Sequence, residues 1–231
     1  MPTRISTGAP LVTQATFWSQ EYENNPADRD AALNHARFQA FDPNAKPDAA
    51  AALPAALAFA GDVYRGLDAR SLKADDLSWA QDHLRMLSGL YGVLRPLDAM
   101  QPYRLEMGTK LHNPRGEDLY SFWGDRIAKT LDADAAAHDA PLIVNLASNE
   151  YWKAVDKKAL KTPVVAANFL DVKEGKARAL FMFVKRARGL MARFIIEKEL
   201  NDPGGLKKFR ADGYRYNKAE STARELVFTR E

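Results

Sequence analysis

Positively charged residues gather in one stretch near the C-terminus of the chain. Four of them, Lys185, Arg186, Arg188 and Arg193, fall within nine residues, among apolar residues at helical spacing. This spacing predicts a helix over residues 185–200 with an apolar side and a mainly basic side. Such a side is typical of a surface that tracks the phosphates of a nucleic acid, and a solvated helix face with the same charges is the alternative.

The basic character continues beyond this helix. Further cations follow, with two aromatic residues interleaved: Lys207, Lys208, Arg210, Tyr214, Arg215 and Tyr216. Residues 171–231 hold 15 Lys and Arg against 9 Asp and Glu, whereas residues 1–170 hold 18 against 21. The formal net charge of +3 therefore conceals a C-terminal quarter of +6. An asymmetry of this kind indicates a surface that faces a polyanion.

A glycine-containing turn, residues 88–92, is a second candidate for phosphate contact. Helical spacing predicts a helix over residues 75–87 before it and a short helical segment after it, so residues 75–98 have the order helix, hairpin, helix. Gly89 and Gly92 let backbone amides approach a phosphate, because no Cβ intervenes. Arg85 and Arg95 flank the turn and can hold the same backbone. An ordinary corner between two helices accounts for these residues equally well.

A third candidate follows the apolar run 142–146, which is typical of a buried strand. Asn145, Ser148, Asn149 and Glu150 lie at its carboxyl end, where α/β sheets bind ligands. Ser148 and Asn149 can hold an anion, and Glu150 can act as an acid or a base. The same residues also suit a helix cap and a first helical turn. An enzyme acting on a nucleotide or nucleic acid is therefore the alternative function, with no other catalytic residue predicted.

Other chemistry has no recognisable pattern in the sequence. The chain has no cysteine, which excludes disulfides, thiolate ligands and thiol catalysis. No phosphate-binding glycine motif and no G-x-S-x-G elbow occurs. We therefore predict neither a cofactor nor a metal site. The histidines are far apart and form no metal-binding pair: His35, His83, His112 and His138.

Composition and length place the chain among globular proteins. Its 231 residues are 46% hydrophobic and 27% charged, and no apolar run reaches the length of a membrane span. Residues 1–10 lack the pattern of a signal peptide. We expect a cytoplasmic protein that does not contact membranes. The oligomeric state is not encoded in any motif, and a monomer is the expectation.

The predicted elements of residues 1–231 mix helices and strands without an internal repeat, which indicates a mixed α/β class, and a chain of this length can form one large domain or two small ones. Helices are expected over 28–41, 49–59, 75–87, 120–131 and 185–200. Strands are expected over 142–146, 164–172, 178–184 and 225–229.

Several long strings, in order along the chain from about Ala31 to Phe228, resemble the bacterial peroxide-stress protein YaaA family. They are Gly61–Tyr64 (GDVY), Leu87–Asp98 (LSGLYGVLRPLD), Met100–Thr109 (MQPYRLEMGT), Phe122–Gly124 (FWG), Asn145–Tyr151 (NLASNEY) and Lys185–Arg193 (KRARGLMAR).

The resemblance implies a single domain with a mixed sheet surrounded by helices, an embedded helix–hairpin–helix element, and a basic cleft that binds double-stranded DNA. It also implies a cytoplasmic role in the response to hydrogen peroxide, which limits oxidative damage and is linked to lower free iron. Gly89, Gly92 and Arg95 match the hairpin pattern. The residues expected to contact duplex phosphates, largely without sequence preference, are Arg85, Gly89, Gly92, Arg95, Arg104, Lys110, Lys185, Arg186, Arg188 and Arg193.

The sequence departs from the family pattern at its start. Family members begin with an apolar strand and a Ser-Pro-Ala-Lys-Thr-like segment, whereas Ile5–Pro10 contains no lysine and follows no apolar strand. Any function of that lysine is therefore not expected here. An iron-sequestering protein is a third, less favoured hypothesis, because no cluster of ligands is visible in the sequence.

Overall fold

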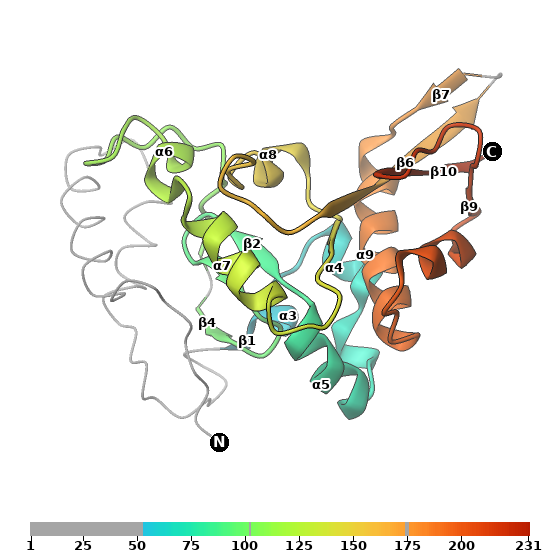
Figure 1. The fold of residues 1–231 in the computed structure, drawn as a ribbon, viewed down its shortest axis with the longest axis horizontal. Helices are drawn as coiled ribbons and strands as arrows, with labels where there is room; N and C mark the ends of the chain where they lie inside the picture. Colours follow the sequence, from blue (N-terminus) through green and yellow to red (C-terminus); the bar gives the residue numbers. More distant parts are fainter. Residues whose placement is uncertain (1–52, 102, 174–175) are drawn as a thin grey trace. The chain divides into compact units, whose positions relative to one another are not determined.

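A computed structural model describes residues 53–101, 103–173 and 176–231. These residues fall into two compact units, residues 53–58 with 85–101 and 103–124, and residues 59–84 with 125–173 and 176–231. Figure 1 labels their helices and strands. The predicted mixture of α and β structure is confirmed in the described residues. The predicted single domain stays a prediction, and each unit is described by itself. The segment Ile5–Pro10 and the predicted helix 28–41 lie outside the described residues.

The second unit is built on a mixed six-stranded sheet. Neighbouring strands follow the order β5, β6, β10, β9, β8 across the sheet. A further strand, β7, pairs with the end of β6. The bounds are β5 Ile143–Asn145, β6 Val164–Lys173, β7 Lys176–Arg178, β8 Arg210–Ala211, β9 Tyr214–Tyr216 and β10 Glu225–Arg230. The β5–β6 and β6–β10 pairs are parallel, and the others are antiparallel. The predicted strands 142–146, 164–172 and 225–229 are confirmed to within two residues.

The helices of this unit include one long helix and several short ones. Their bounds are α4 Asp62–Leu67, η1 Ala69–Ser71, α5 Ala74–His83, α7 Arg126–Ala135, α8 Asn149–Trp152, α9 Phe181–Glu197 and η2 Pro203–Lys208. The basic helix predicted over 185–200 is α9, which begins four residues earlier. The predicted strand 178–184 is therefore wrong over most of its length. Val184 belongs to the first turns of α9, and a short apolar run does not distinguish strand from helix.

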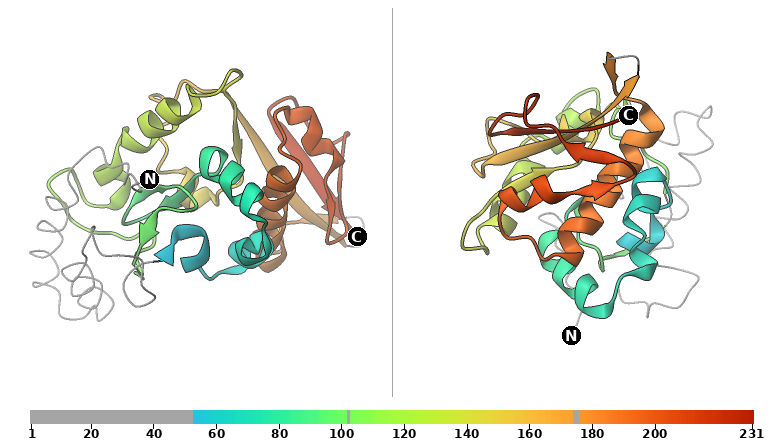
Figure 2. Two further views of the ribbon diagram at one scale, coloured as in Figure 1. Left: turned by 90° about the horizontal axis from the view of Figure 1, so that it is seen from below. Right: turned by 90° about the vertical axis from the view of Figure 1, so that its right-hand side faces the viewer.

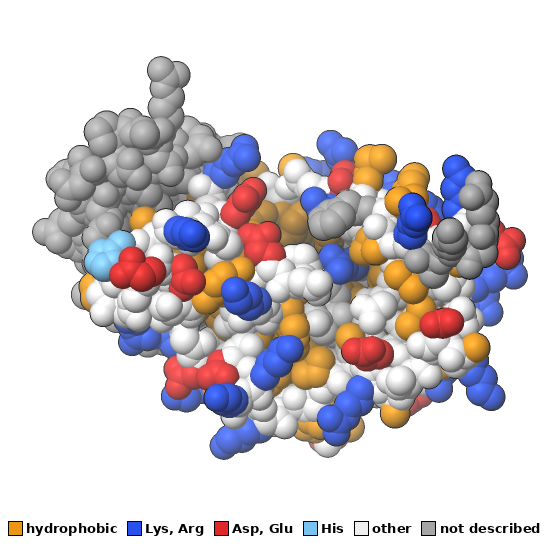
Figure 3. All heavy atoms as spheres, turned by 90° about the horizontal axis from the view of Figure 1, so that it is seen from above, with side chains coloured by type: hydrophobic (Ala, Val, Ile, Leu, Met, Phe, Trp, Pro, Cys, Tyr) orange, Lys and Arg blue, Asp and Glu red, His pale blue; other side chains and the backbone are white. Residues whose placement is uncertain are grey.

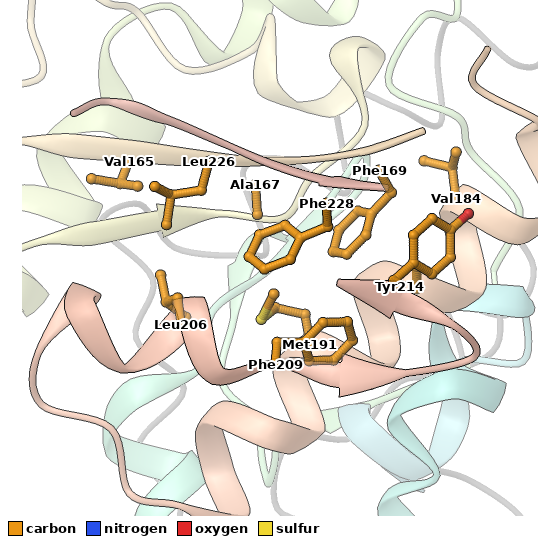
Figure 4. Close-up of a cluster of buried hydrophobic side chains, with 11 residues drawn as sticks. Val165, Ala167, Phe169, Val184, Met191, Leu206, Phe209, Tyr214, Leu226 and Phe228 are labelled. Carbon is orange, nitrogen blue, oxygen red and sulfur yellow. The ribbon is translucent and has the colours of Figure 1, made fainter. Parts of the chain in front are cut away.

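The core of the second unit lies between α9 and the sheet (Figure 4). Phe169 of β6, Phe228 of β10 and Phe209 pack with ring centroids 5.4 to 6.0 Å apart. Tyr214 of β9 packs on Phe169 at 5.3 Å, and Met191 of α9 is fully buried beside these rings. Burial of these side chains orients α9, because its apolar side must face the sheet.

Helix α4 lies directly against α9, as the right-hand view of Figure 2 shows. Glycines on both helices allow this approach. A Cβ on Gly189 of α9 would stand 1.8 Å from the carbonyl oxygen of Val63, and a Cβ on Gly66 of α4 would stand 2.3 Å from that of Arg186. The backbones therefore touch at these two points, which fixes the direction in which each basic side chain of α9 points.

The first unit consists of short elements: β1 Leu53–Pro54, α3 Ala55–Ala58, β2 Met86–Ser88, β3 Gly92–Leu94, β4 Ala99–Met100 and α6 Leu119–Trp123. Strands β2 and β3 form an antiparallel hairpin, and β1 pairs with β4. Residues 49–52 of the predicted helix 49–59 lie outside the described residues, and the described part is helical only over α3, which follows Pro54. The predicted helix 120–131 is divided at Gly124, whose φ of +53° ends α6 before α7 begins.

The helix–hairpin–helix element expected over residues 75–98 is not confirmed. Helix α5 ends at His83, β2 and β3 follow, and the chain enters its next described helix, α6, only at Leu119. The turn between β2 and β3 explains the difference. The Ser88 hydroxyl accepts a hydrogen bond from the Tyr91 amide at 2.9 Å, and Gly92 has a φ of +74°. These features close a β-hairpin instead of leading into a second helix.

Candidate nucleic-acid interface

Arg193 of α9 is held by the fold at several points. Its Nη1 atom donates hydrogen bonds to the carbonyl oxygens of Leu67 and Asp68, at 3.1 and 3.0 Å. The same atom donates to the hydroxyl of Ser71 at 2.8 Å, and Nε donates to Glu197 at 2.8 Å. Arg193 thus satisfies carbonyl groups at the C-terminal end of α4. Its first role is to join α9 to α4 and η1.

Arg186 has one ionic partner within the described part of the chain and remains half exposed. Its Nε atom donates to the carboxylate of Asp212, in the turn between β8 and β9, at 2.8 Å. Lys185 beside it is exposed to solvent. The basic residues that the sequence places on one helix are therefore not equivalent, because packing of α9 gives each a different environment.

Arg188 differs from these residues. It is half-buried, and its Nε atom is enclosed without a hydrogen-bond partner among the described residues. Desolvation by burial lowers the pKa of its guanidinium group. A guanidinium still carries its positive charge at neutral pH. Arg188 is thus a partly desolvated cation on the helix that the sequence indicated.

The cations after α9 lie at the edge of the sheet. We call Lys207, Lys208, Arg210 and Arg215 the basic edge, and all four are exposed. Arg210 and Arg215 stand directly opposite each other in the β8–β9 pair. Like charges in this relation destabilise a pair of strands, so the arrangement is favourable only when a counter-charge is present.

The aromatic residues between these cations face the interior. Tyr214 is buried, and its hydroxyl donates to Asp171 at 3.1 Å. Tyr216 is half-buried and packs edge-on to Phe228 with ring centroids 5.9 Å apart. The cations and the aromatic residues alternate in the sequence, but in the structure the cations lie on the surface and the aromatic rings pack inward. An alternation of this kind is what a strand with one buried face produces.

The two glycines of the predicted hairpin are enclosed by their own unit. A Cβ on Gly89 would stand 2.4 Å from the carbonyl oxygen of Leu105, and a Cβ on Gly92 would stand 2.7 Å from the ring of Trp123. The indole nitrogen of Trp123 also donates to the carbonyl oxygen of Gly89 at 3.0 Å. Glycine is therefore required at both positions by packing, whatever else the turn contacts.

The other basic residues predicted in the first unit divide by exposure. Arg104 and Lys110 are exposed, whereas Arg85 and Arg95 are half-buried. The backbone amide of Arg95 donates to the Asp98 carboxylate at 2.8 Å, which fixes the turn after β3. Exposure makes Arg104 and Lys110 the better placed of the four to meet a large ligand.

The Asn145–Glu150 segment is organised as a turn and a helix cap. The Asn145 side chain accepts a hydrogen bond from the Ala147 amide at 2.9 Å, and the Ser148 hydroxyl accepts from the Tyr151 amide at 3.4 Å. Asn149 and Glu150 are exposed at the start of the four-residue helix α8. These contacts are the capping arrangement that the sequence offers as the alternative to an active site. The enzyme hypothesis gains no support from them.

A half-buried tyrosine with a shifted pKa in the second unit was not indicated by the sequence. Tyr64 of α4 stacks on Phe59 with ring centroids 4.8 Å apart. Burial raises the pKa of its hydroxyl, and Tyr151 raises it further. Tyr64 and Tyr151 come from two of the motifs on which the family resemblance rests, but neither motif by itself indicates that the two hydroxyl groups influence each other.

Histidines and carboxylates do not gather into a metal site in the described part of the chain, where no group of three or more potential ligands occurs. The rings of His83 and His138 lie 4.7 Å apart, and His83 stacks on Trp79 at 3.7 Å. On the face drawn in Figure 3, the lysine and arginine side chains are scattered among acidic ones.

Comparison with models of known families shows to which family the chain belongs. The family model described as peroxide stress protein YaaA matches residues 25–220. The chain belongs to this family. The resemblance found in the sequence motifs is thereby confirmed.

Similar proteins from other bacteria support the same membership. The chain is 57% identical over 200 residues to a UPF0246 protein of Maricaulis maris, a match that covers 87% of this chain and 74% of the relative. It is 54% identical to a UPF0246 protein of Caulobacter vibrioides and 56% identical to one of Caulobacter sp. strain K31, each over 87% of this chain and 77% of the relative.

Membership in the YaaA family is consistent with the predicted role in the response to peroxide. Among the described residues, no helix is both long enough and apolar enough to cross a membrane. The DNA contacts, the link to iron, the cytoplasmic location and the monomeric state are predictions that these findings leave untested.

Proposed function

We propose that this member of the YaaA family binds double-stranded DNA through the phosphate backbone during the response to peroxide. The observation that carries the proposal is the basic edge of the second unit. Arg210 and Arg215 face each other across β8 and β9, and Lys207 and Lys208 precede them, all four exposed. A polyanion relieves the repulsion within this group, because each phosphate supplies the missing counter-charge.

The position of the aromatic residues favours backbone contacts over contacts with unpaired bases. Proteins that bind single strands stack bases on exposed rings. Tyr214 is buried and Tyr216 is covered by Phe228 and Lys207, so neither ring offers a free face for stacking. Charge without exposed rings suits a duplex, whose bases are already stacked.

The remaining contacts of the proposal are those expected from the sequence. Arg104 and Lys110 of the first unit and Lys185 of the second are exposed, and the proposal includes them as phosphate contacts. Arg85, Gly89, Gly92 and Arg95 stay in the proposal as predicted contacts only, because packing within the unit already accounts for both glycines.

The chemistry of protection follows from composition. The chain has no cysteine and cannot reduce peroxide by thiol chemistry. Protection by this protein is therefore indirect. Occupation of the DNA backbone, together with lower free iron, is the form of protection that the family resemblance implies.

Salt-dependent titration tests the proposal. A fluorescent duplex is titrated with protein at about 50 and 200 mM salt, and we expect affinity to fall steeply, since each phosphate contact releases counterions. The Lys207→Gln/Lys208→Gln variant should reduce the slope of log affinity against log salt by about 2. The matched control is Lys157→Gln/Lys158→Gln, an adjacent exposed lysine pair in the same unit. An affinity that ignores salt, or equal losses in both variants, overturns the proposal.

A further inference from the structure

Arg188 sits on the buried side of α9. One helical turn before it lies Val184 and one turn after it lies Ala192, and both are only 8% exposed. Met191, three residues on, is fully buried. Arg188 therefore emerges from a row of buried apolar side chains. The contrast with Arg186 is clear, since that side chain is half exposed.

The charge of Arg188 has no counterpart among the residues that the structure describes. Its Nε atom is enclosed and makes no hydrogen bond with any residue that the structure describes. The terminal nitrogens are not enclosed, so a ligand can reach the guanidinium from outside. Arg186 and Arg193 of the same helix each pair with a carboxylate, that of Asp212 and that of Glu197 respectively.

Packing alone does not account for this arginine. The apolar stem of an arginine often covers hydrophobic surface while its charged head stays in water. Here one donor of the head is itself enclosed, at a cost in folding free energy that a methionine of similar shape would avoid. A ligand anion that pairs with the terminal nitrogens offsets part of this cost, because it supplies a counter-charge to the partly desolvated guanidinium.

We propose that Arg188 forms a recessed site for a single phosphate group carrying two negative charges, that is, a phosphate monoester or inorganic phosphate. A planar guanidinium binds two oxygens of such a group at once. A phosphodiester within a duplex is flanked by sugars on both sides and does not enter a recess, whereas a terminal phosphate does. The free anion and the phosphate at the end of a DNA strand share this chemistry.

The strand-end form of the inference rests on the proposed DNA binding, and the free-anion form does not. Titration with inorganic phosphate, followed by the rise in melting temperature, tests the free anion. Two duplexes that differ only in a 5′-phosphate or a 5′-hydroxyl test the strand end. We expect phosphate to raise the melting temperature, and the phosphorylated duplex to bind about tenfold more tightly than the other.

Arg188→Met removes the charge and keeps a side chain of similar length. This variant should melt at or above the temperature of the wild type, because no internal partner is lost, and should show neither response to phosphate. Arg188→Lys should recover a minor part of both responses, since an ammonium group does not bind two oxygens in a plane. Arg224→Gln, an exposed arginine of the same unit, is the control and should respond as the wild type does.

The outcomes separate the two proposals. If phosphate stabilises Arg188→Met as much as the wild type, or if Arg188→Met unfolds at a markedly lower temperature, the recessed site is overturned. If phosphate binding depends on Arg188 but neither duplex binds, the site stands and the proposed function fails. If both duplexes bind equally and phosphate has no effect, the proposed function stands and the site fails.

Discussion

At the residue scale, the ionic contacts of the second unit differ most in how far they are shielded from water. Asp171, at the end of β6, is only 8% exposed. Its carboxylate accepts hydrogen bonds from Arg230 and from the hydroxyl of Tyr214. Burial, together with the nearby carboxylate, raises the pKa of Tyr214 to about 12. The three groups form one buried network that joins β6, β9 and β10, and each member depends on the others.

Replacing Asp171 should therefore be costly. Asp171→Ala leaves the Arg230 guanidinium without its partner in a buried place, and we expect a loss of about 3 kcal/mol in the free energy of unfolding. Tyr214→Phe removes one hydrogen bond and keeps the ring packed on Phe169, so we expect about 1 kcal/mol. Urea unfolding of the two variants measures both values. Equal losses would contradict a network centred on the carboxylate.

Asp132 gives a contact whose contribution depends on pH. Slight burial raises the pKa of its carboxyl, but hydrogen bonds from the Thr162 hydroxyl and from the amides of Lys161 and Thr162 lower it overall. A lowered pKa means that the stabilisation is complete above the ordinary carboxyl value and is lost as the pH falls through the folded value. Asp132→Ala should cost about 1 kcal/mol at neutral pH, because the carboxylate is only half-buried and water screens its charge.

The test is urea unfolding of wild type and Asp132→Ala at neutral pH and again at about pH 3, which is below the ordinary pKa of an aspartate. The difference between the two proteins should shrink at the lower pH, because protonation of the carboxyl in the unfolded state, and then in the folded state, removes the benefit of the lowered pKa. Asp139→Ala, an exposed carboxylate after the end of α7, serves as the control. A difference that is constant with pH would contradict the contribution of the charge.

Residue roles were the least predictable part of the site. The sequence shows four cations around α9 as one group, since periodicity places side chains on faces only approximately. It contains no sign that Arg193 caps α4, because Leu67 and Asp68 lie more than 120 residues away. The role of the glycines in the 88–92 turn was equally hidden in the sequence. Their requirement comes from Leu105 and Trp123, which no local pattern reveals.

At the element scale, long elements with a consistent period were predictable and short ones were not. The strands β6 and β10 and the helix α9 follow from apolar spacing. The hairpins β2–β3 and β8–β9 were missed, since strands of two or three residues show no period. They form because turns at Gly92 and Gly213, with φ of +74° and +81°, bring the flanking residues into register.

The contact between α4 and α9 is the element-scale feature most open to a test. A Cβ on Gly189 meets the Val63 carbonyl oxygen at 1.8 Å, so Gly189→Ala must push the two helices apart. We expect a loss of about 3 kcal/mol, although alanine favours a helix more than glycine does. Gly61→Ala is the control, because its Cβ meets nothing closer than 4.0 Å. Thermal unfolding compares the two, and similar stability would contradict the close approach.

At the scale of the whole molecule, charge is distributed unequally along the chain. Residues 171–231 hold 15 Lys and Arg against 9 Asp and Glu. Some of this excess is paired within the fold, at Arg186, Arg193 and Arg230. The basic edge carries cations with no carboxylate opposite them in the β8–β9 pair. Family membership and fold class were predictable from the whole sequence, because motifs and long elements are recognisable even where the interpretation of a single residue is wrong.

This distribution predicts opposite effects of salt on the free and the DNA-bound protein. Without DNA, raising salt from about 50 to 200 mM should raise the melting temperature slightly, because it screens the repulsion between Arg210 and Arg215. With excess duplex, the melting temperature should start higher and fall as salt increases, because bound duplex stabilises only the folded state and its affinity declines. In Arg210→Gln/Arg215→Gln both effects should weaken together, since the same two charges cause them. A duplex effect that persists unchanged at the higher salt would place the binding energy outside phosphate contacts.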